Sequence, residues 1–141
     1  MASPPERDRS PSGSEFKTRT PSNELIRLIY ATRNSLKGYR RVWRDEAAFR
    51  FQTVILIAMV PLAFLLAESW SVFALLIGSW VVVLAAELGN SGIEAAVDRI
   101  GREEHDLAAK AKDAGSAMVM TAMILSAGIW LAVLADRFLI G

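Results

Sequence analysis

The sequence predicts an all-α integral membrane protein with one amphipathic surface helix and three transmembrane helices. Of its 141 residues, 52% are hydrophobic and four are Trp, which is more apolar than an ordinary soluble domain of this size. An amphipathic stretch at 24–45 precedes three apolar spans near 50–67, 70–98 and 112–135. There is no Cys, so a disulfide framework and a thiolate metal site are both excluded.

Residues 1–23 form a segment of different composition, rich in Ser, Pro and Arg and almost without apolar side chains. Such a segment cannot bury enough surface to fold, so we expect a disordered leader. It lacks the apolar core of a signal peptide, which argues against cleavage. The leader ends where the apolar periodicity begins, so residues 24–141 are expected to form one membrane domain.

The stretch 24–45 is predicted to be a helix lying in the lipid headgroup layer. One stripe is apolar and the opposite side is basic, a pattern typical of interfacial helices. The apolar stripe comprises Leu25, Leu28, Ile29, Leu36, Tyr39 and Trp43, and the basic side comprises Arg33, Lys37, Arg40, Arg41 and Arg44. The basic side would attract anionic lipid or a phosphate-bearing ligand. A purely electrostatic anchor explains the same pattern.

Charge asymmetry predicts how the spans are oriented. Eleven of the sixteen Lys and Arg residues precede Gln52, whereas the short turn at 68–71 has none. By the positive-inside rule the N-terminus is cytoplasmic, and three spans place the C-terminus on the opposite side. The first span contains Pro61, which membrane helices tolerate.

A row of acids and amides follows the second apolar run without a break. Glu87, Asn90, Glu94 and Asp98 fall on one helical face, while 70–86 holds no ionisable residue. About 20 residues at 1.5 Å each cross a roughly 30 Å hydrocarbon core, so the row begins at the cytoplasmic edge of the bilayer. Ionisable groups at that depth indicate a functional site. Asp98 is equally well explained as the solvated continuation of the helix.

A second polar cluster, Lys112, Asp113 and Ser116, begins the third span. A Lys near a helix start opposes the helix dipole, so either an anion binds beside Lys112 or its side chain reaches the membrane surface. Carboxylates and an amide suit Mg²⁺ shared with substrate phosphates, and Lys suits the phosphates themselves. No P-loop and no protein-kinase signature is present. A phosphotransferase reading would therefore need an uncommon nucleotide site.

Four motifs together make the sequence similar to a known family. They are Glu87-Leu-Gly-Asn90-Ser91-Gly92-Ile93-Glu94 ending at Asp98, Lys112-Asp113-Ala114-Gly115-Ser116-Ala117, Lys37-Gly38, and Trp43-Arg-Asp-Glu46-Ala-Ala-Phe49-Arg50. In these motifs the chain resembles the prokaryotic diacylglycerol kinases, small trimeric membrane kinases, over about residues 25–130. It departs from the family pattern in Gly92 for Ala, Gly89 for a bulky apolar residue and Met118 where a small residue is common.

This resemblance implies ATP-dependent phosphorylation of the diacylglycerol hydroxyl to phosphatidic acid by a homotrimer in the bacterial inner membrane, with a periplasmic C-terminus. Glu87 would be the general base, Asn90 would support the transfer site, and Glu46 and Glu94 would hold the Mg²⁺ carried by ATP. The resemblance assigns ATP binding to Arg27, Asn34, Glu103, Glu104, His105, Lys112 and Asp113. It assigns lipid binding to Arg33, Ser35, Phe49, Arg50, Ser116 and Trp130.

Two other functions compete with this one, and no nucleic-acid partner is expected. A kinase of undecaprenol would belong to the same family, but the Gly-Ser-Ala after Asp113 and the run 99–101 resemble the diacylglycerol type more closely. A non-enzymatic transporter or assembly subunit would use the acidic row as an ion relay. A relay needs ionisable groups deeper in the bilayer, whereas all three spans are free of them at their centres.

Overall fold

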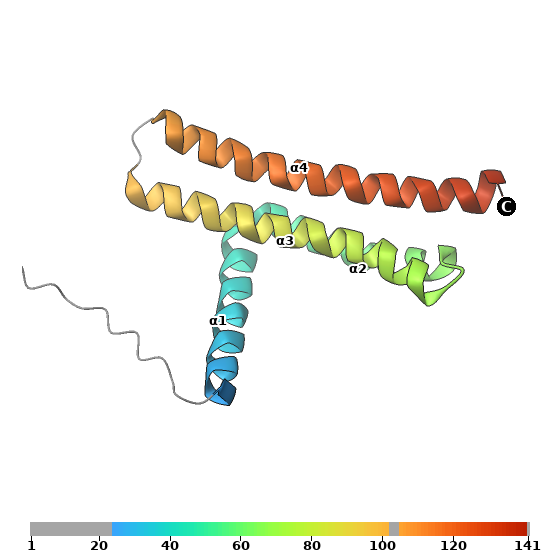
Figure 1. Ribbon diagram of the computed structural model, residues 1–141, viewed down its shortest axis with the longest axis horizontal. Coiled ribbons are helices and arrows are strands. Elements are labelled where there is room, and N and C mark those ends of the chain that lie inside the picture. The colour runs from blue at the N-terminus through green and yellow to red at the C-terminus, as the bar shows by residue number, and fades with distance from the viewer. Residues whose placement is uncertain (1–23, 102–104, 141) are drawn as a thin grey trace, which may run out of the picture. The chain divides into compact units, whose positions relative to one another are not determined.

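A computed structural model of the chain describes residues 24–101 and 105–140 (Figure 1). Its elements are α1 (Glu24–Asp45), α2 (Ala47–Leu66), α3 (Trp70–Ile100), α4 (Asp106–Ala135) and a π-helical stretch at Asp136–Ile140. The described residues contain no strand, and α2, α3 and α4 are each long and apolar enough to cross a membrane. The predicted all-α fold with three spans is therefore confirmed. The predicted leader at 1–23 lies outside the described residues.

The chain divides into two units, Met1–Asn34 and Ser35–Gly141. In the first unit the described part of α1 is an exposed helical segment without buried residues. Its side chains interact locally: Arg27 Nη1 donates to Glu24 Oε1 at 2.9 Å, and Thr32 Oγ1 donates to the Leu28 carbonyl. Glu24 stands in the first turn, where a negative charge complements the helix dipole.

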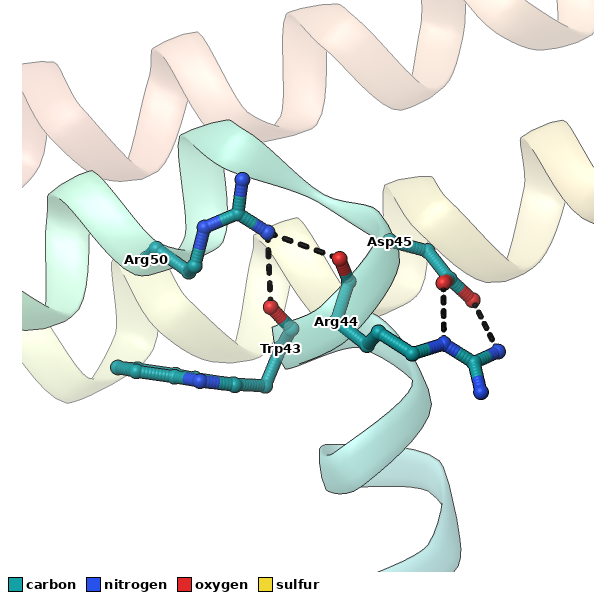
Figure 2. A network of polar contacts seen from close by, with 4 residues as sticks. All are labelled: Trp43, Arg44, Asp45 and Arg50. Carbon is teal, nitrogen blue, oxygen red and sulfur yellow. Dashed lines mark hydrogen bonds and ion pairs between the residues drawn. The ribbon is translucent and has the colours of Figure 1, made fainter.

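In the second unit α1 ends and α2 begins around one extended residue, Glu46 (φ −107°, ψ 112°). The Arg50 guanidinium supports this break, because Nη1 donates to the main-chain carbonyls of Trp43 at 2.9 Å and Arg44 at 3.0 Å (Figure 2). Those carbonyls belong to the last turn of α1, which has few helical donors left for them. Phe49, only 4% exposed, packs between the rings of Tyr39 and Trp43.

The central helix of the second unit is α3, which contacts both α2 and α4; Figure 1 shows α3 and α4 side by side. The Ser69 hydroxyl caps α3 by accepting from the Val72 main-chain N–H at 3.3 Å. With 31 residues, α3 is about 46 Å long and exceeds a roughly 30 Å hydrocarbon core. Its last turns therefore have the length to project beyond the membrane.

Buried residues along α3 change from apolar to polar in the direction of the acidic row. Near the α2–α3 turn, an apolar cluster unites Ala63, Leu66, Leu76 and Trp130. Next comes a hydrogen bond of 2.9 Å between two buried hydroxyls, Ser79 and Ser126, and then a second apolar cluster of Trp80, Val83, Ala86 and Ala122. The buried face continues directly into Glu87 and Ser91. Helix packing thus carries a carboxylate into the protein interior.

Helix α4 starts earlier than its apolar span suggests. His105 accepts the Leu107 main-chain N–H on Nδ1 at 3.2 Å, and Asp106 places a negative charge in the first turn. Lys112 consequently lies beyond the first turn, so the expected conflict between Lys112 and the start of the helix does not arise. At the other end, Arg137 pairs with Glu68 at 2.9 Å and links the π-helical stretch after α4 to the α2–α3 turn.

Candidate active site

The centre of the site is Glu87, a carboxylate only 7% exposed within the membrane-spanning part of the chain. Its Oε2 accepts the side-chain amide of Gln52, on α2, at 3.2 Å. One turn later the Ser91 hydroxyl donates to the Glu87 carbonyl at 2.9 Å. Burial removes most of the water that would otherwise hydrate this carboxylate, so its neighbours determine its orientation and reactivity.

Asn90 and Glu94 lie on the side of α3 that faces α4. Asn90 Nδ2 donates to Glu94 Oε1 at 2.9 Å, while Asn90 Oδ1 is buried without a hydrogen-bond partner. Gly115 of α4 packs directly on this amide, because a Cβ at Gly115 would collide with Asn90 Oδ1. The close approach of α4 therefore holds the Asn90 side chain in position against Glu94.

Lys112 reaches across from α4 to α3, where its Nζ lies 2.6 Å from Asp98 Oδ1. Glu94 is also close enough to act on the Lys112 charge. The pair stays accessible, with 44% of the Lys112 side chain and 59% of the Asp98 side chain exposed. Asp98 is thus the anion beside Lys112 in this structure. Asp113 and Ser116 are exposed on the following turn.

Glu46 lines a cavity of about 530 Å³ between the end of α1 and α3. The other walls are Ser35, Gly38, Tyr39, Arg41, Val42, Asp45, Leu88, Ser91, Gly92 and Ala95. The four wall positions on α3 form a stripe about 100° around the helix from the row that contains Glu94. Within one chain, the cavity that Glu46 lines therefore lies against a different face of α3 from the one that carries Glu94.

This separation bears on the predicted Mg²⁺ site. In the part of the chain that the structure describes, no three Asp, Glu or His side chains group closely enough to hold a metal ion. Mg²⁺ is often bound by one or two carboxylates, with substrate phosphates and water completing its coordination. The hydrogen bond from Asn90 orients the Glu94 carboxylate as an outer-shell partner orients a metal ligand. These residues therefore fit a metal that arrives with a nucleotide.

The α1–α2 junction adds a basic cavity of about 690 Å³. Its lining residues are Lys37, Arg40, Arg41, Trp43, Arg44 and Arg50. Arg44 forms a bidentate pair with Asp45 at 2.7 and 3.1 Å (Figure 2), and this hydrogen-bonded guanidinium holds the pKa of Asp45 below its usual range. Two predicted lipid contacts, Phe49 and Arg50, belong to this junction, where both also have a structural role.

Several predicted residues belong to the first unit, to other parts of the second unit or to the residues that the structure does not describe. Arg27, Arg33 and Asn34 belong to the first unit, and Glu103 and Glu104 lie outside the described residues. His105 is exposed and caps α4, whereas Trp130 is 7% exposed and donates its indole N–H to the Leu76 carbonyl at 3.3 Å. The roles assigned to these residues stay predictions.

Sequence reasoning missed two residues that contact the site, Gln52 and Gly115. The predicted first span includes Gln52 without assigning it a role, although a polar residue inside an apolar span indicates a functional position. In the sequence Gly115 belongs to the Lys112–Ala117 motif, and its close approach to Asn90 results from the packing of α3 on α4.

Comparison with known proteins identifies the family. A family model described as prokaryotic diacylglycerol kinase matches residues 33–134. The chain belongs to the prokaryotic diacylglycerol kinase family. It is 43% identical over 114 residues to the diacylglycerol kinase of Escherichia coli strain K12, covering 81% of this chain and 93% of that protein. It is 41% identical over 123 residues to the Pseudomonas aeruginosa diacylglycerol kinase, covering 87% of this chain and 98% of that protein. It is 41% identical over 106 residues to the Haemophilus influenzae diacylglycerol kinase, covering 75% of this chain and 90% of that protein.

Together with its three apolar helices, this family membership makes the chain a bacterial membrane protein. The structure also places Gly89 and Met118 side by side. A Cβ at Gly89 would lie 2.9 Å from Met118 Cε, so the Met118 side chain occupies space next to Gly89. The small residue on α3 and the large one on α4 are complementary in size.

Proposed function

We propose that the chain transfers the γ-phosphoryl group of ATP to the hydroxyl of diacylglycerol, forming phosphatidic acid at the cytoplasmic face of the membrane. The family match over residues 33–134 supports both the kinase activity and diacylglycerol as the lipid acceptor. The three relatives named above are all diacylglycerol kinases, which favours diacylglycerol over undecaprenol and an enzyme over an ion relay. The nucleotide, the membrane face and the residue roles belong to the proposal.

Glu87 is proposed to accept the proton of the lipid hydroxyl as that oxygen attacks the γ-phosphorus. Its burial supports this role, because a carboxylate shielded from water at the membrane edge can meet a lipid hydroxyl without competing solvent. The oxygen–phosphorus bond to the acceptor forms while the bond to the β-phosphate oxygen breaks, and ADP leaves. The proton from the hydroxyl goes to the Glu87 carboxylate.

Residues further along α3 and α4 are proposed to help neutralise the negative charge on the phosphates. Glu46 and Glu94 would hold Mg²⁺, which when bound neutralises phosphate charge. Asn90 keeps the Glu94 carboxylate oriented through its 2.9 Å hydrogen bond. Lys112 is accessible and reaches toward the acidic row, so a phosphate oxygen can replace Asp98 as its partner.

We further propose a homotrimer whose sites are shared between copies. Within one chain, Glu46 lines a cavity on one face of α3, while Glu94 lies on the α4 side near Lys112. A neighbouring copy can supply the missing carboxylate to each site. Mixing Glu46→Gln chains with Glu94→Gln chains should then restore activity that neither variant has alone. Absence of recovery in mixed oligomers would argue for a site within one chain.

The first experiment measures phosphate transfer from ATP by the purified protein in detergent micelles. Acceptors are diacylglycerol, undecaprenol and no lipid, each with and without Mg²⁺, and Glu87→Gln is assayed beside the wild type. We expect Mg²⁺-dependent phosphatidic acid formation that Glu87→Gln nearly abolishes, with ATP binding retained.

The other outcomes separate the parts of the proposal. Phosphorylation of undecaprenol alone would leave the chemistry in place and change the acceptor. Loss of ATP binding in Glu87→Gln would remove its assignment as the base. A folded oligomer that phosphorylates no acceptor would refute the kinase function.

A further inference from the structure

We propose that Gln52 is a positioning residue that orients the Glu87 carboxylate for proton transfer. This inference rests on the proposed role of Glu87 as the base. Gln52 lies on α2, is 7% exposed, and donates its Nε2 to Glu87 Oε2 at 3.2 Å. The two residues are 35 positions apart in sequence, so helix packing alone brings them together.

The main chain of Gln52 is itself fixed against α3. Its carbonyl accepts the indole N–H of Trp80 at 2.9 Å, and Trp80 is 8% exposed. Trp80 and Glu87 are seven residues apart and therefore stand two turns apart on nearly the same side of α3. Gln52 is bound to α3 at both points, through its backbone at one turn and its side chain at the other. Such a two-point contact fixes where the amide can lie.

The chemistry of the two groups sets which atoms meet. An ionised carboxylate only accepts hydrogen bonds, so the NH₂ end of the amide must face Glu87. Oε2 is thereby occupied, and within the described residues Oε1 of Glu87 has no hydrogen bond. The amide thus leaves one oxygen in a defined place to receive a proton. Reaction rates are sensitive to such placement because a shift of about 1 Å can cost about a hundredfold.

The Gln52 amide satisfies Glu87 but is itself only half satisfied at this position. Its Oε1 is buried and has no hydrogen-bond partner. An unpaired buried acceptor destabilises a fold, and more so in a membrane span where no water can replace the partner. An apolar residue of similar size would avoid that penalty but would leave Glu87 Oε2 without the Gln52 donor. The residue is therefore better suited to orienting Glu87 than to stabilising the contact between α2 and α3.

The test compares Gln52→Met with the wild type in the full-length protein, assayed in micelles with ATP, Mg²⁺ and diacylglycerol. Met keeps the length of the side chain and removes the amide. Gln52→Leu is a second variant in case Met packs poorly. Ser126→Ala is the matched control, since it also removes a buried interhelical hydrogen bond, 2.9 Å to Ser79, remote from Glu87. Thermal unfolding is measured for every variant.

We expect kcat to fall about tenfold to a hundredfold in Gln52→Met, with the KM for ATP within about threefold of the wild type. Thermal stability should fall, because Glu87 Oε2 loses the Gln52 donor, and Ser126→Ala shows how far destabilisation of this kind affects kcat. In a Glu87→Gln background the same substitution should cause no further loss, because its effect acts through the base. Ser126→Ala should lower stability and leave kcat unchanged.

An unchanged kcat in folded Gln52→Met and Gln52→Leu, beside an inactive Glu87→Gln, would overturn this inference and leave the proposed function intact. A loss of kcat that Ser126→Ala shares at similar destabilisation, or that persists in the Glu87→Gln background, would also overturn it. Full activity of Glu87→Gln would instead refute the proposed base, and the role of Gln52 with it.

Discussion

The contact between Gly115 and Asn90 allows a sharp test of how α4 supports the site. In Gly115→Ala the new Cβ would collide with Asn90 Oδ1 and would lie 3.3 Å from Asn90 Cγ and 3.5 Å from Ile93 Cδ1. Asn90 is not free to move aside, because its Nδ2 is hydrogen-bonded to Glu94. Either the two helices separate or the amide rotates and loses Glu94. Both responses disturb the transfer site.

The size of the effect follows from these two responses. Overpacking a well-filled helix contact costs about 1–3 kcal/mol. A hydrogen bond to a charged group, such as that from Asn90 to Glu94, contributes about 1.5–3 kcal/mol. Replacing Gly by Ala in a helix returns about 1 kcal/mol of helix propensity. We therefore expect a net destabilisation of up to about 2 kcal/mol and at least a tenfold fall in kcat.

The assay is thermal unfolding followed by Trp fluorescence, with phosphate transfer measured on the same samples. Gly128→Ala on the same helix is the control, because nothing lies within 4 Å of a Cβ at that position. That variant should be about 0.5–1 kcal/mol more stable than the wild type and fully active. Gly115→Ala with wild-type stability and activity would refute the close packing of α4 on Asn90.

Three further predictions concern packing and charge. Gly89→Leu should destabilise the fold by less than about 1 kcal/mol, because the atom it meets is the end of the flexible Met118 side chain, which is 40% exposed and can move aside. Adding Met118→Ala should therefore change thermal unfolding by little more than Met118→Ala alone does. Asp98→Asn should change thermal stability little because the pair is about half exposed, whereas Lys112→Met should raise the KM for ATP tenfold or more in steady-state kinetics. The lowered pKa of Asp45 means that its carboxyl stabilises the fold above about pH 4 and that this contribution is lost as pH falls through the lowered value. Asp45→Asn should therefore reduce, slightly, the dependence of thermal stability on pH between 3 and 7.

Local pattern was sufficient to predict the fold class. Continuous apolar runs predicted three spanning helices, and the 3.6-residue period predicted the amphipathic helix before them. The same period placed Glu87, Asn90 and Glu94 on one face of a helix that the structure shows to be unbroken from Trp70 to Ile100. Such predictions succeed because each depends on residues within a few turns of one another.

Partners on other helices could not be predicted in this way. Nothing near Gln52 in sequence indicates that Glu87 is its partner, and nothing near Lys112 indicates Asp98, because helix packing determines both pairs. The start of α4 was missed for a different reason. Hydropathy marks where an apolar span begins, whereas a helix begins at its cap, which here is His105.

The turn of α3 that carries Glu87 has a distinct contact on each side. Glu87 is hydrogen-bonded from α2, Asn90 is packed under Gly115 of α4, and Ser91 lines the cavity at the end of α1. A shift of any of these helices therefore displaces a different polar group of the same turn. Under the proposed mechanism, substitutions far from the chemistry should lower kcat whenever they alter one of these helix contacts. Substitutions that touch neither these contacts nor the residues proposed to bind ATP, Mg²⁺ or lipid should change stability alone.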